Sequence, residues 1–237
     1  MINERQVQYE HKGTLLEGFL AYADSSTVPA PAVMISHAWA GRDEFACDKA
    51  RAIARMGYTG FALDLYGQDV RGRTPEESSR LMQPFLQDRA LLQSRMQASL
   101  DILVSMPEVR ADRVAAMGFC FGGLCVLDLA RTGADLRGVI SVHGFFTPPG
   151  NLDGKPVRAK ILALHGHDDP MVPMETAVAF GQEMTAAGVD WQLHVYGGTK
   201  HAFTNPHAND PVRGTVYRPE ADRRAWVAIR DFLGEVL

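Results

Sequence analysis

Short apolar segments alternate with longer amphipathic segments along most of the chain, and this alternation restricts the fold more than any other feature. The apolar segments are rich in Val, Ile, Leu and Ala, as strands covered on both faces are. Strands that alternate with helices form a mostly parallel sheet with helices on both faces. The predicted strands are residues 32–37, 60–65, 114–119, 138–143, 161–165 and 193–196, and the predicted helices are residues 44–56, 88–106, 121–131, 174–187 and 220–236.

The N-terminal region departs from this pattern. Residues 7–10 and 15–22 are separated by Lys12-Gly13, which predicts an antiparallel hairpin on the edge of the parallel sheet. No Ser/Gly/Pro-rich linker or change of composition divides the 237 residues, so we expect residues 1–237 to form one domain.

Residues 66–87 are the least regular part of the sequence. They contain Arg71-Gly72-Arg73-Thr74-Pro75 and Pro84, which favour a loop with one or two short helices. Long irregular segments in compact domains are often lids or binding loops. We therefore weigh two interpretations, a part of the substrate pocket and a variable surface insertion.

Composition and charge restrict the possible partners. The chain is 46% hydrophobic, and its 24 basic residues are scattered among 28 acidic ones for a formal charge of -4. Without a basic face, nucleic acid is not an expected partner. The start lacks the apolar core of a signal peptide, and no apolar run reaches the roughly 20 residues that cross a bilayer. We expect no membrane association, a cytoplasmic location, a small-molecule substrate and a monomer or small homo-oligomer.

Three cysteines, Cys47, Cys120 and Cys125, are an odd number and include no Cys-x-x-Cys pair. This argues against a disulfide framework, a redox dithiol and a cysteine-rich zinc site. The sequence therefore predicts reduced thiols and requires no metal or organic cofactor.

The most specific motif is Gly118-Phe119-Cys120-Phe121-Gly122-Gly123, between a predicted strand and a predicted helix. A sharp strand-to-helix turn of the form Gly-x-nucleophile-x-Gly exposes its central residue in strained backbone geometry. The helix N-terminus favours a thiolate at Cys120, and the backbone N–H of Phe121 can bind an oxyanion. The alternative is a small core thiol beside packing glycines.

Partners for this nucleophile follow in the order that α/β-hydrolases use, acid and then histidine. Asp168-Asp169 follows the predicted strand 161–165, and His201 follows the strand 193–196. His201 is a candidate base, and the aspartate is a candidate to fix its tautomer. Taken singly, each residue could instead be an ordinary surface or turn residue.

Over nearly its whole length the chain resembles the dienelactone hydrolase family of α/β-hydrolases. The resemblance rests on the Cys120 turn, Gly166-x-x-Asp169-x-x-Val172-Pro173, His201-Ala202-Phe203, Asp64-Leu65-Tyr66-Gly67 and residues 221–226. It implies an α/β-hydrolase fold and cleavage of small esters or lactones by a Cys120, Asp169 and His201 triad through a thioester. The family spacing Gly-x-x-Asp-x-x-Val-Pro selects Asp169, and not Asp168, as the acid of this triad.

Two positions depart from the family pattern. The family's His-Glu-x-x-Gly loop, which supplies an oxyanion N–H and a glutamate for the resting cysteine, corresponds to His37-Ala38-Trp39-Ala40-Gly41. The resemblance implies an oxyanion N–H from Trp39, with Ala38 unable to replace the glutamate and the thiol more dependent on His201. Asn205 stands where an arginine of the family would bind a substrate carboxylate. The resemblance therefore implies the family's reaction class for this chain more strongly than it implies dienelactone as the substrate.

Other substrate contacts are weaker expectations. Tyr66, His143 and Phe145 are candidates to line the pocket, although aromatic residues are more often core. Asn205 belongs to the same group. Arg80, like Arg71 and Arg73, could replace the missing arginine or be a solvated surface residue.

Two rival functions remain. One is a binding or regulatory protein that retains the fold without turnover. The other is a metallohydrolase, because His165-Gly166-His167-Asp168-Asp169 begins like a His-x-His-x-Asp-His ligand run. Pro170 stands where that run needs its next histidine, and proline has no ligating side chain.

Overall fold

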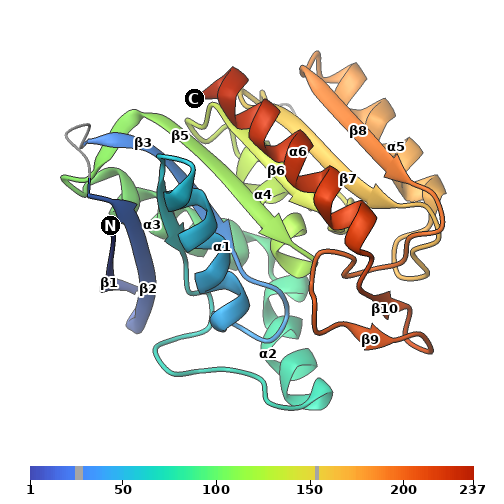
Figure 1. The fold of residues 1–237 in the computed structure, drawn as a ribbon, viewed down its shortest axis with the longest axis horizontal. Coiled ribbons are helices and arrows are strands. Elements are labelled where there is room, and N and C mark those ends of the chain that lie inside the picture. The colour runs from blue at the N-terminus through green and yellow to red at the C-terminus, as the bar shows by residue number, and fades with distance from the viewer. Residues whose placement is uncertain (25–28, 153–154) are drawn as a thin grey trace.

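A computed structural model describes residues 1–24, 29–152 and 155–237. Eight strands form one sheet in the order β1-β2-β4-β3-β5-β6-β7-β8 (Figure 1). All neighbours from β4 through β8 pair in parallel. The predicted mostly parallel sheet is confirmed. Its strands are β1 (Ile2–His11), β2 (Thr14–Ala23), β3 (Ala30–Ser36), β4 (Thr59–Ala62), β5 (Val109–Phe119), β6 (Gly138–Val142), β7 (Lys160–Gly166) and β8 (Trp191–Tyr196).

The predicted N-terminal hairpin is confirmed, and it is longer than the sequence indicated. β1 and β2 pair antiparallel along ten residues each, joined by Lys12 and Gly13, which both have positive φ. Two residues with positive φ give the type I′ turn that matches the twist of paired strands. β2 then pairs antiparallel with β4, so the hairpin covers one edge of the parallel sheet.

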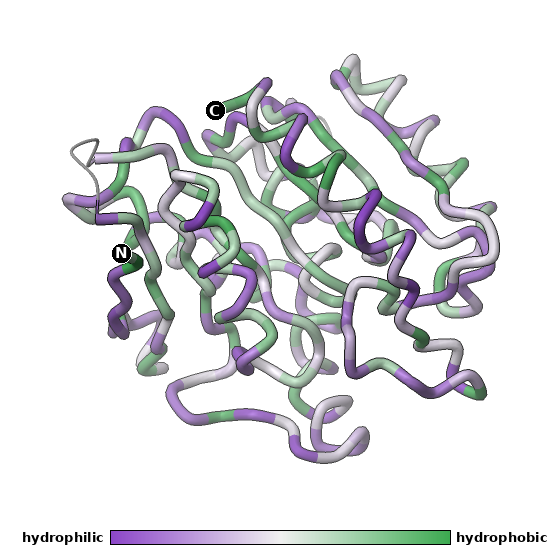
Figure 2. The backbone as a smooth tube through the Cα atoms, viewed as in Figure 1, coloured by the Kyte–Doolittle hydropathy of each residue, from purple (hydrophilic) through white to green (hydrophobic). Residues whose placement is uncertain are grey.

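Helices cover both faces of the sheet, and each face has its own apolar core. α1 (Glu44–Arg55) and α6 (Pro219–Val236) lie on one face, and α3 (Arg89–Val104), α4 (Phe121–Arg131) and α5 (Met174–Ala186) lie on the other (Figure 1). Neighbouring strand residues alternate between the two cores, as Met34 and Ile35 do in β3. In Figure 2 the central strands are mostly hydrophobic, whereas hydrophilic and hydrophobic residues alternate along the helices.

Residues 66–87 form a loop followed by one helix, in agreement with the predicted loop with one or two short helices. The helix, α2 (Pro75–Gln87), has 13 residues and is longer than expected. Thr74 caps it by accepting a hydrogen bond from the N–H of Glu77, and Pro75 occupies the first turn, where a proline costs no hydrogen bond. Pro84 lies inside this helix.

The carboxyl ends of the parallel strands meet at one edge of the sheet, where ligands of open α/β sheets bind. The loops after β3, β5, β6 and β7 begin there, and β9 (Asn209–Asp210) pairs with β10 (Thr215–Val216) in the segment that follows β8. In Figure 1 this edge faces α2 and the β9–β10 pair. Among the described residues, no helix combines the length and apolar character needed to cross a membrane.

Candidate active site

Cys120 lies in the turn between β5 and α4, as the motif predicted. Its backbone has φ 55° and ψ -118°, a conformation that costs a non-glycine residue free energy. Gly122 makes the turn possible, because a Cβ at that position would overlap the carbonyl oxygen of Ser36. The start of α4 therefore packs directly on the end of β3. Cys120 is partly exposed, whereas Cys47 and Cys125 are buried.

Asp169 and His201 form a buried pair. The Nδ1–H of His201 donates to Oδ2 of Asp169 at 2.6 Å, and both side chains are almost completely excluded from solvent. Oδ1 of Asp169 accepts from the backbone N–H groups of Met171 and Val172 at 2.8 and 3.2 Å. These bonds fix the carboxylate and place the proton on Nδ1, which leaves Nε2 as the atom available for proton transfer.

The loop that carries His201 is held against the end of β7. A Cβ at Gly166 would lie 2.5 Å from the carbonyl oxygen of Thr199, so only glycine allows this approach. His201 itself bridges to Thr215, with its N–H donating to Gly214 and its carbonyl accepting from Val216. The histidine is thereby fixed by backbone hydrogen bonds on both sides.

The pKa of His201 is raised to about 10. Burial alone lowers the pKa of a histidine, but the charge of the Cys120 sulfur and the hydrogen-bonded Asp169 carboxylate more than offset this effect. Nε2 of His201 is buried, and among the described residues it has no hydrogen-bond partner within the usual distance and angle limits. The Cys120 sulfur is nevertheless close enough to affect the pKa of the ring. A pKa this high keeps the His201 ring protonated at neutral pH.

Phe121 and Trp39 are the two residues predicted to offer backbone N–H groups near Cys120. Phe121 is the first residue of α4, and Trp39 lies in the loop that follows β3. In the described parts of the chain, neither N–H donates a backbone hydrogen bond. Free N–H groups near a nucleophile are the donors that stabilise a tetrahedral oxyanion.

His143 lies beneath the nucleophile instead of lining an open pocket. Its Nδ1 accepts a hydrogen bond from the N–H of Cys120 at 3.1 Å, and its Nε2 is 2.9 Å from Oγ1 of Thr204. Burial, followed by the proximity of His201, lowers its pKa well below the ordinary value, so the ring is neutral. With both nitrogens engaged, His143 connects the nucleophile turn to the histidine loop.

The remaining predicted contacts fall into two groups. Phe145 lies beside His201, with ring centroids 5.8 Å apart, and the hydroxyl of Tyr66 donates to the carbonyl of Trp39 at 2.9 Å. Asn205 and Arg80 are more remote from the triad. The Asn205 side chain accepts from the N–H of His207 within its own loop, and Arg80 is exposed on α2.

Sequence reasoning assigned no role to two residues that contact this site, His37 and Thr204. Thr204 contacts His143, and Nδ1 of His37 contacts the carbonyl of Ala38 at 2.6 Å. The signal for Thr204 was a buried hydroxyl three residues after His201. The signal for His37 was a polar residue at the end of an otherwise apolar strand.

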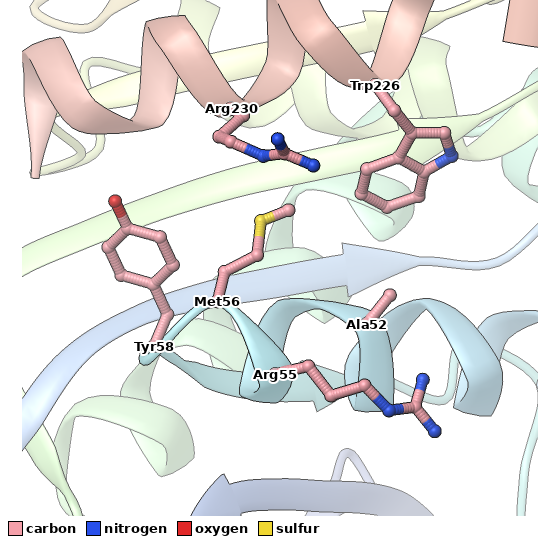
Figure 3. Close-up of a pocket in the computed structure, with 6 residues that line it drawn as sticks. All are labelled: Ala52, Arg55, Met56, Tyr58, Trp226 and Arg230. Carbon is pink, nitrogen blue, oxygen red and sulfur yellow. The ribbon is translucent and has the colours of Figure 1, made fainter. Parts of the chain in front are cut away.

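Several surface cavities lie outside the candidate triad. One, of about 600 Å³, lies beside the Trp39 loop and is lined by Ala40, Asp43, Asp69, Arg71, Gly72 and Arg73. Figure 3 shows a second, of about 540 Å³, between α1 and α6; it is lined by Ala52, Arg55, Met56, Tyr58, Trp226 and Arg230. The second cavity contains none of the predicted site residues.

The described residues include no group of three or more His, Cys, Asp or Glu side chains placed to hold a metal ion. His165 is buried against Phe146, whereas His167 is exposed and pairs with Asp168 at 2.7 Å. The ligand run considered for a metallohydrolase therefore does not converge in the described structure.

A strained cysteine turn, a buried Asp–His pair and two candidate oxyanion N–H groups at the carboxyl edge of a parallel sheet define an α/β-hydrolase. The chain belongs to the dienelactone hydrolase family, whose model matches residues 16–237. The chain is 30% identical to a probable 2-oxo-3-(5-oxofuran-2-ylidene)propanoate lactonase from a Bradyrhizobium species, over 90% of this chain and 88% of that protein.

Solved structures agree with this assignment. A dienelactone hydrolase-like promiscuous phosphotriesterase from metagenomic libraries is 34% identical, with a TM-score of 0.93 over 99% of this chain and 98% of that one. The fold also matches a dienelactone hydrolase from Klebsiella pneumoniae, at 20% identity and a TM-score of 0.83 over 99% of each chain. The resemblance inferred from the sequence is confirmed.

Thiol alkylation distinguishes the three cysteines. Cys47 and Cys125 are buried, and burial raises the pKa of both thiols. We expect limiting iodoacetamide to modify Cys120 selectively, because thiolate character and access together govern alkylation. Peptide mass spectrometry locates the adduct, and Cys120→Ala is the control. Modification of Cys47 or Cys125 before Cys120 in the folded protein would contradict this assignment.

Proposed function

We propose that this protein hydrolyses small carboxylic esters and lactones through a Cys120, His201 and Asp169 triad and a thioester intermediate. One observation carries the proposal: a buried, hydrogen-bonded Asp169–His201 pair lies beside a partly exposed cysteine in a strained turn. No comparison favours the non-catalytic alternative.

The first half-reaction uses the ion pair of Cys120 and His201. The thiolate attacks the carbonyl carbon and forms a C–S bond, while the N–H groups of Trp39 and Phe121 stabilise the oxyanion. When the tetrahedral intermediate collapses, the C–O bond breaks and the leaving oxygen takes the Nε2 proton of His201. With a lactone, the leaving hydroxyl remains attached to the acyl group.

The second half-reaction restores the enzyme. Neutral His201 accepts a proton from water as the water attacks the thioester carbonyl, and the same two N–H groups stabilise the second oxyanion. Cleavage of the C–S bond releases the carboxylic acid and returns the thiolate beside the imidazolium. Asp169 orients the ring and stabilises its positive charge in both halves.

A substrate panel tests the reaction class. We expect turnover of aryl esters and small neutral lactones, and a dienelactone rate no greater than theirs, because Asn205 offers no cation for the dienelactone carboxylate. A p-nitrophenyl phosphotriester belongs in the panel because one similar structure is described as a promiscuous phosphotriesterase.

Steady-state rates should be combined with rapid quenching of the reaction and mass spectrometry of the protein. An acyl adduct on Cys120 is the expected intermediate. Absence of turnover across the ester and lactone panel would contradict the proposal, and a strong preference for dienelactone would contradict the specificity argument.

A further inference from the structure

In the loop after β3, three consecutive backbone carbonyl groups each accept a hydrogen bond. The carbonyl of Ala38 accepts from Nδ1 of His37 at 2.6 Å and from the N–H of Gly41 at 3.2 Å. The carbonyl of Trp39 accepts from the hydroxyl of Tyr66 at 2.9 Å, and that of Ala40 accepts from the N–H of Gly72, also at 2.9 Å. The loop therefore has defined peptide orientations on both sides of the Trp39 N–H.

We propose that His37 and Tyr66 are positioning residues that hold the Trp39 N–H toward the reacting carbonyl. This inference rests on the proposed acyl-transfer function. In a planar trans peptide the C=O and N–H groups point in opposite directions. Binding the Ala38 carbonyl on one side of the loop therefore directs the Trp39 N–H to the other side. A rotated peptide would place a carbonyl oxygen where the oxyanion develops.

The tautomer of His37 is defined by its second contact. Nε2 accepts a hydrogen bond from the backbone N–H of Leu65 at 3.2 Å, so Nδ1 carries the proton that is donated to Ala38. Burial lowers the pKa of His37, which keeps the ring neutral with one donor and one acceptor. His37 is completely enclosed, at 1% exposure, so water does not compete for either nitrogen.

The His37 ring also provides a hydrogen-bond acceptor just beyond the point where the pairing of β3 with β4 ends. The N–H of Leu63 donates to the carbonyl of Ile35, the last regular bond between β3 and β4 at this edge. Two residues further along, the acceptor for Leu65 is the His37 ring instead of a strand carbonyl. The side chain thus ties the loop after β4 to the loop that carries Trp39.

Tyr66 is placed by the Asp64 side chain. Oδ1 of Asp64 accepts from the N–H groups of Tyr66 and Gly67 at 2.9 and 3.1 Å. The Tyr66 ring then packs against His37, with centroids 4.9 Å apart, and against Phe121 at 6.5 Å. One aromatic ring therefore contacts both elements that supply the oxyanion donors. This gives the Asp64-Leu65-Tyr66-Gly67 motif a role beyond the turn itself.

Tyr66→Phe is the cleaner test, because it removes one hydroxyl and keeps the ring. Loss of a whole oxyanion donor lowers kcat by about 10²–10³-fold, so loosening one by removing its support should lower kcat by about 10-fold. We expect KM for a p-nitrophenyl ester to stay within about 2-fold, because the effect arises in the transition state. Tyr58→Phe, in the cavity of Figure 3, is the matched control and should behave as wild type.

His37 offers a matched pair of variants. The amide nitrogen introduced by His37→Asn can occupy the place of Nδ1 and donate to Ala38, whereas the amide oxygen introduced by His37→Gln can occupy the place of Nε2 and accept from Leu65. Both variants remove the ring, so their packing losses are similar. We expect His37→Gln to lose more kcat than His37→Asn, by about 10-fold, because it loses the donor that orients the peptide.

Iodoacetamide alkylation of Cys120 separates this role from general damage, because displacement of iodide by the thiolate develops no oxyanion. The expected result is a lower kcat for Tyr66→Phe and His37→Gln with alkylation rates and thermal unfolding midpoints near wild type. Unchanged hydrolysis in both variants would overturn the inference. A parallel loss of hydrolysis and alkylation would also overturn it, since it would indicate a merely structural role. Failure of the triad itself would appear separately, as hydrolysis retained by Cys120→Ala.

Discussion

Cys120→Ala is expected to lower kcat for ester hydrolysis by roughly 10⁴-fold or more, the scale of loss when a covalent nucleophile is removed from a triad. The variant keeps the backbone turn and both oxyanion N–H groups, but it has no atom that can form the acyl bond. It should still bind substrate, because removing the sulfur leaves the neighbouring aromatic surface in place. The measurement is steady-state hydrolysis combined with a search for the acyl-enzyme by mass spectrometry.

Cys125→Ala is the matched control for this substitution. Cys125 lies inside α4, the helix that begins directly after Cys120, and it is fully buried. Its replacement removes a small buried side chain and should reduce the free energy of unfolding by about 1 kcal/mol without changing the chemical step. Retained hydrolysis by Cys120→Ala, with Cys125→Ala also active, would show that another group performs the attack.

Asp169→Asn should lower kcat by roughly 10³–10⁴-fold, because a triad histidine held in the wrong tautomer cannot accept the required proton. In the structure Oδ1 of Asp169 accepts two backbone N–H groups. An asparagine keeps its oxygen there and presents its amide N–H₂ to His201. Nδ1 of His201 must then accept, which places the ring proton on Nε2, facing Cys120.

The pH dependence provides a second measurement of the same variant. Hydrogen bonding and charge from Asp169 contribute to raising the pKa of His201 to about 10, so their removal lowers that pKa. The His201 imidazolium should then be lost at lower pH, so the alkaline limb of the kcat/KM profile for ester hydrolysis should move to lower pH. Asp168→Asn is the control, since Asp168 is exposed and pairs with His167. Equal activity losses in the two variants would contradict the assignment of Asp169.

Much of the fold was predictable because the parallel strands are buried on both faces and therefore read as continuous apolar segments. The length of β1 was not predictable in the same way. Its first half contains Asn3, Glu4 and Arg5, polar residues that an edge strand accepts on an exposed surface. A helix within residues 66–87 was predicted, but not that a single helix of 13 residues would continue through Pro84.

The candidate triad could be proposed from sequence because each residue lies in the turn or loop that follows a recognisable strand. The supporting contacts could not, since they depend on the relative positions of loops that are distant in sequence. Nothing local to His37 indicates that its ring will accept from Leu65, 28 residues away. His143 shows the same limit: the sequence placed it at the end of a strand, but only the fold turns its ring beneath Cys120.

The close packing of Gly122 on Ser36 has a consequence for how this enzyme can change. The Cys120 turn and the start of the loop that carries Trp39 meet through main-chain atoms, so their spacing is independent of the side chains that line the site. α2 and the β9–β10 segment flank the same sheet edge without supplying any triad residue. New substrate preferences can therefore arise in these flanking segments while the reaction geometry is inherited unchanged.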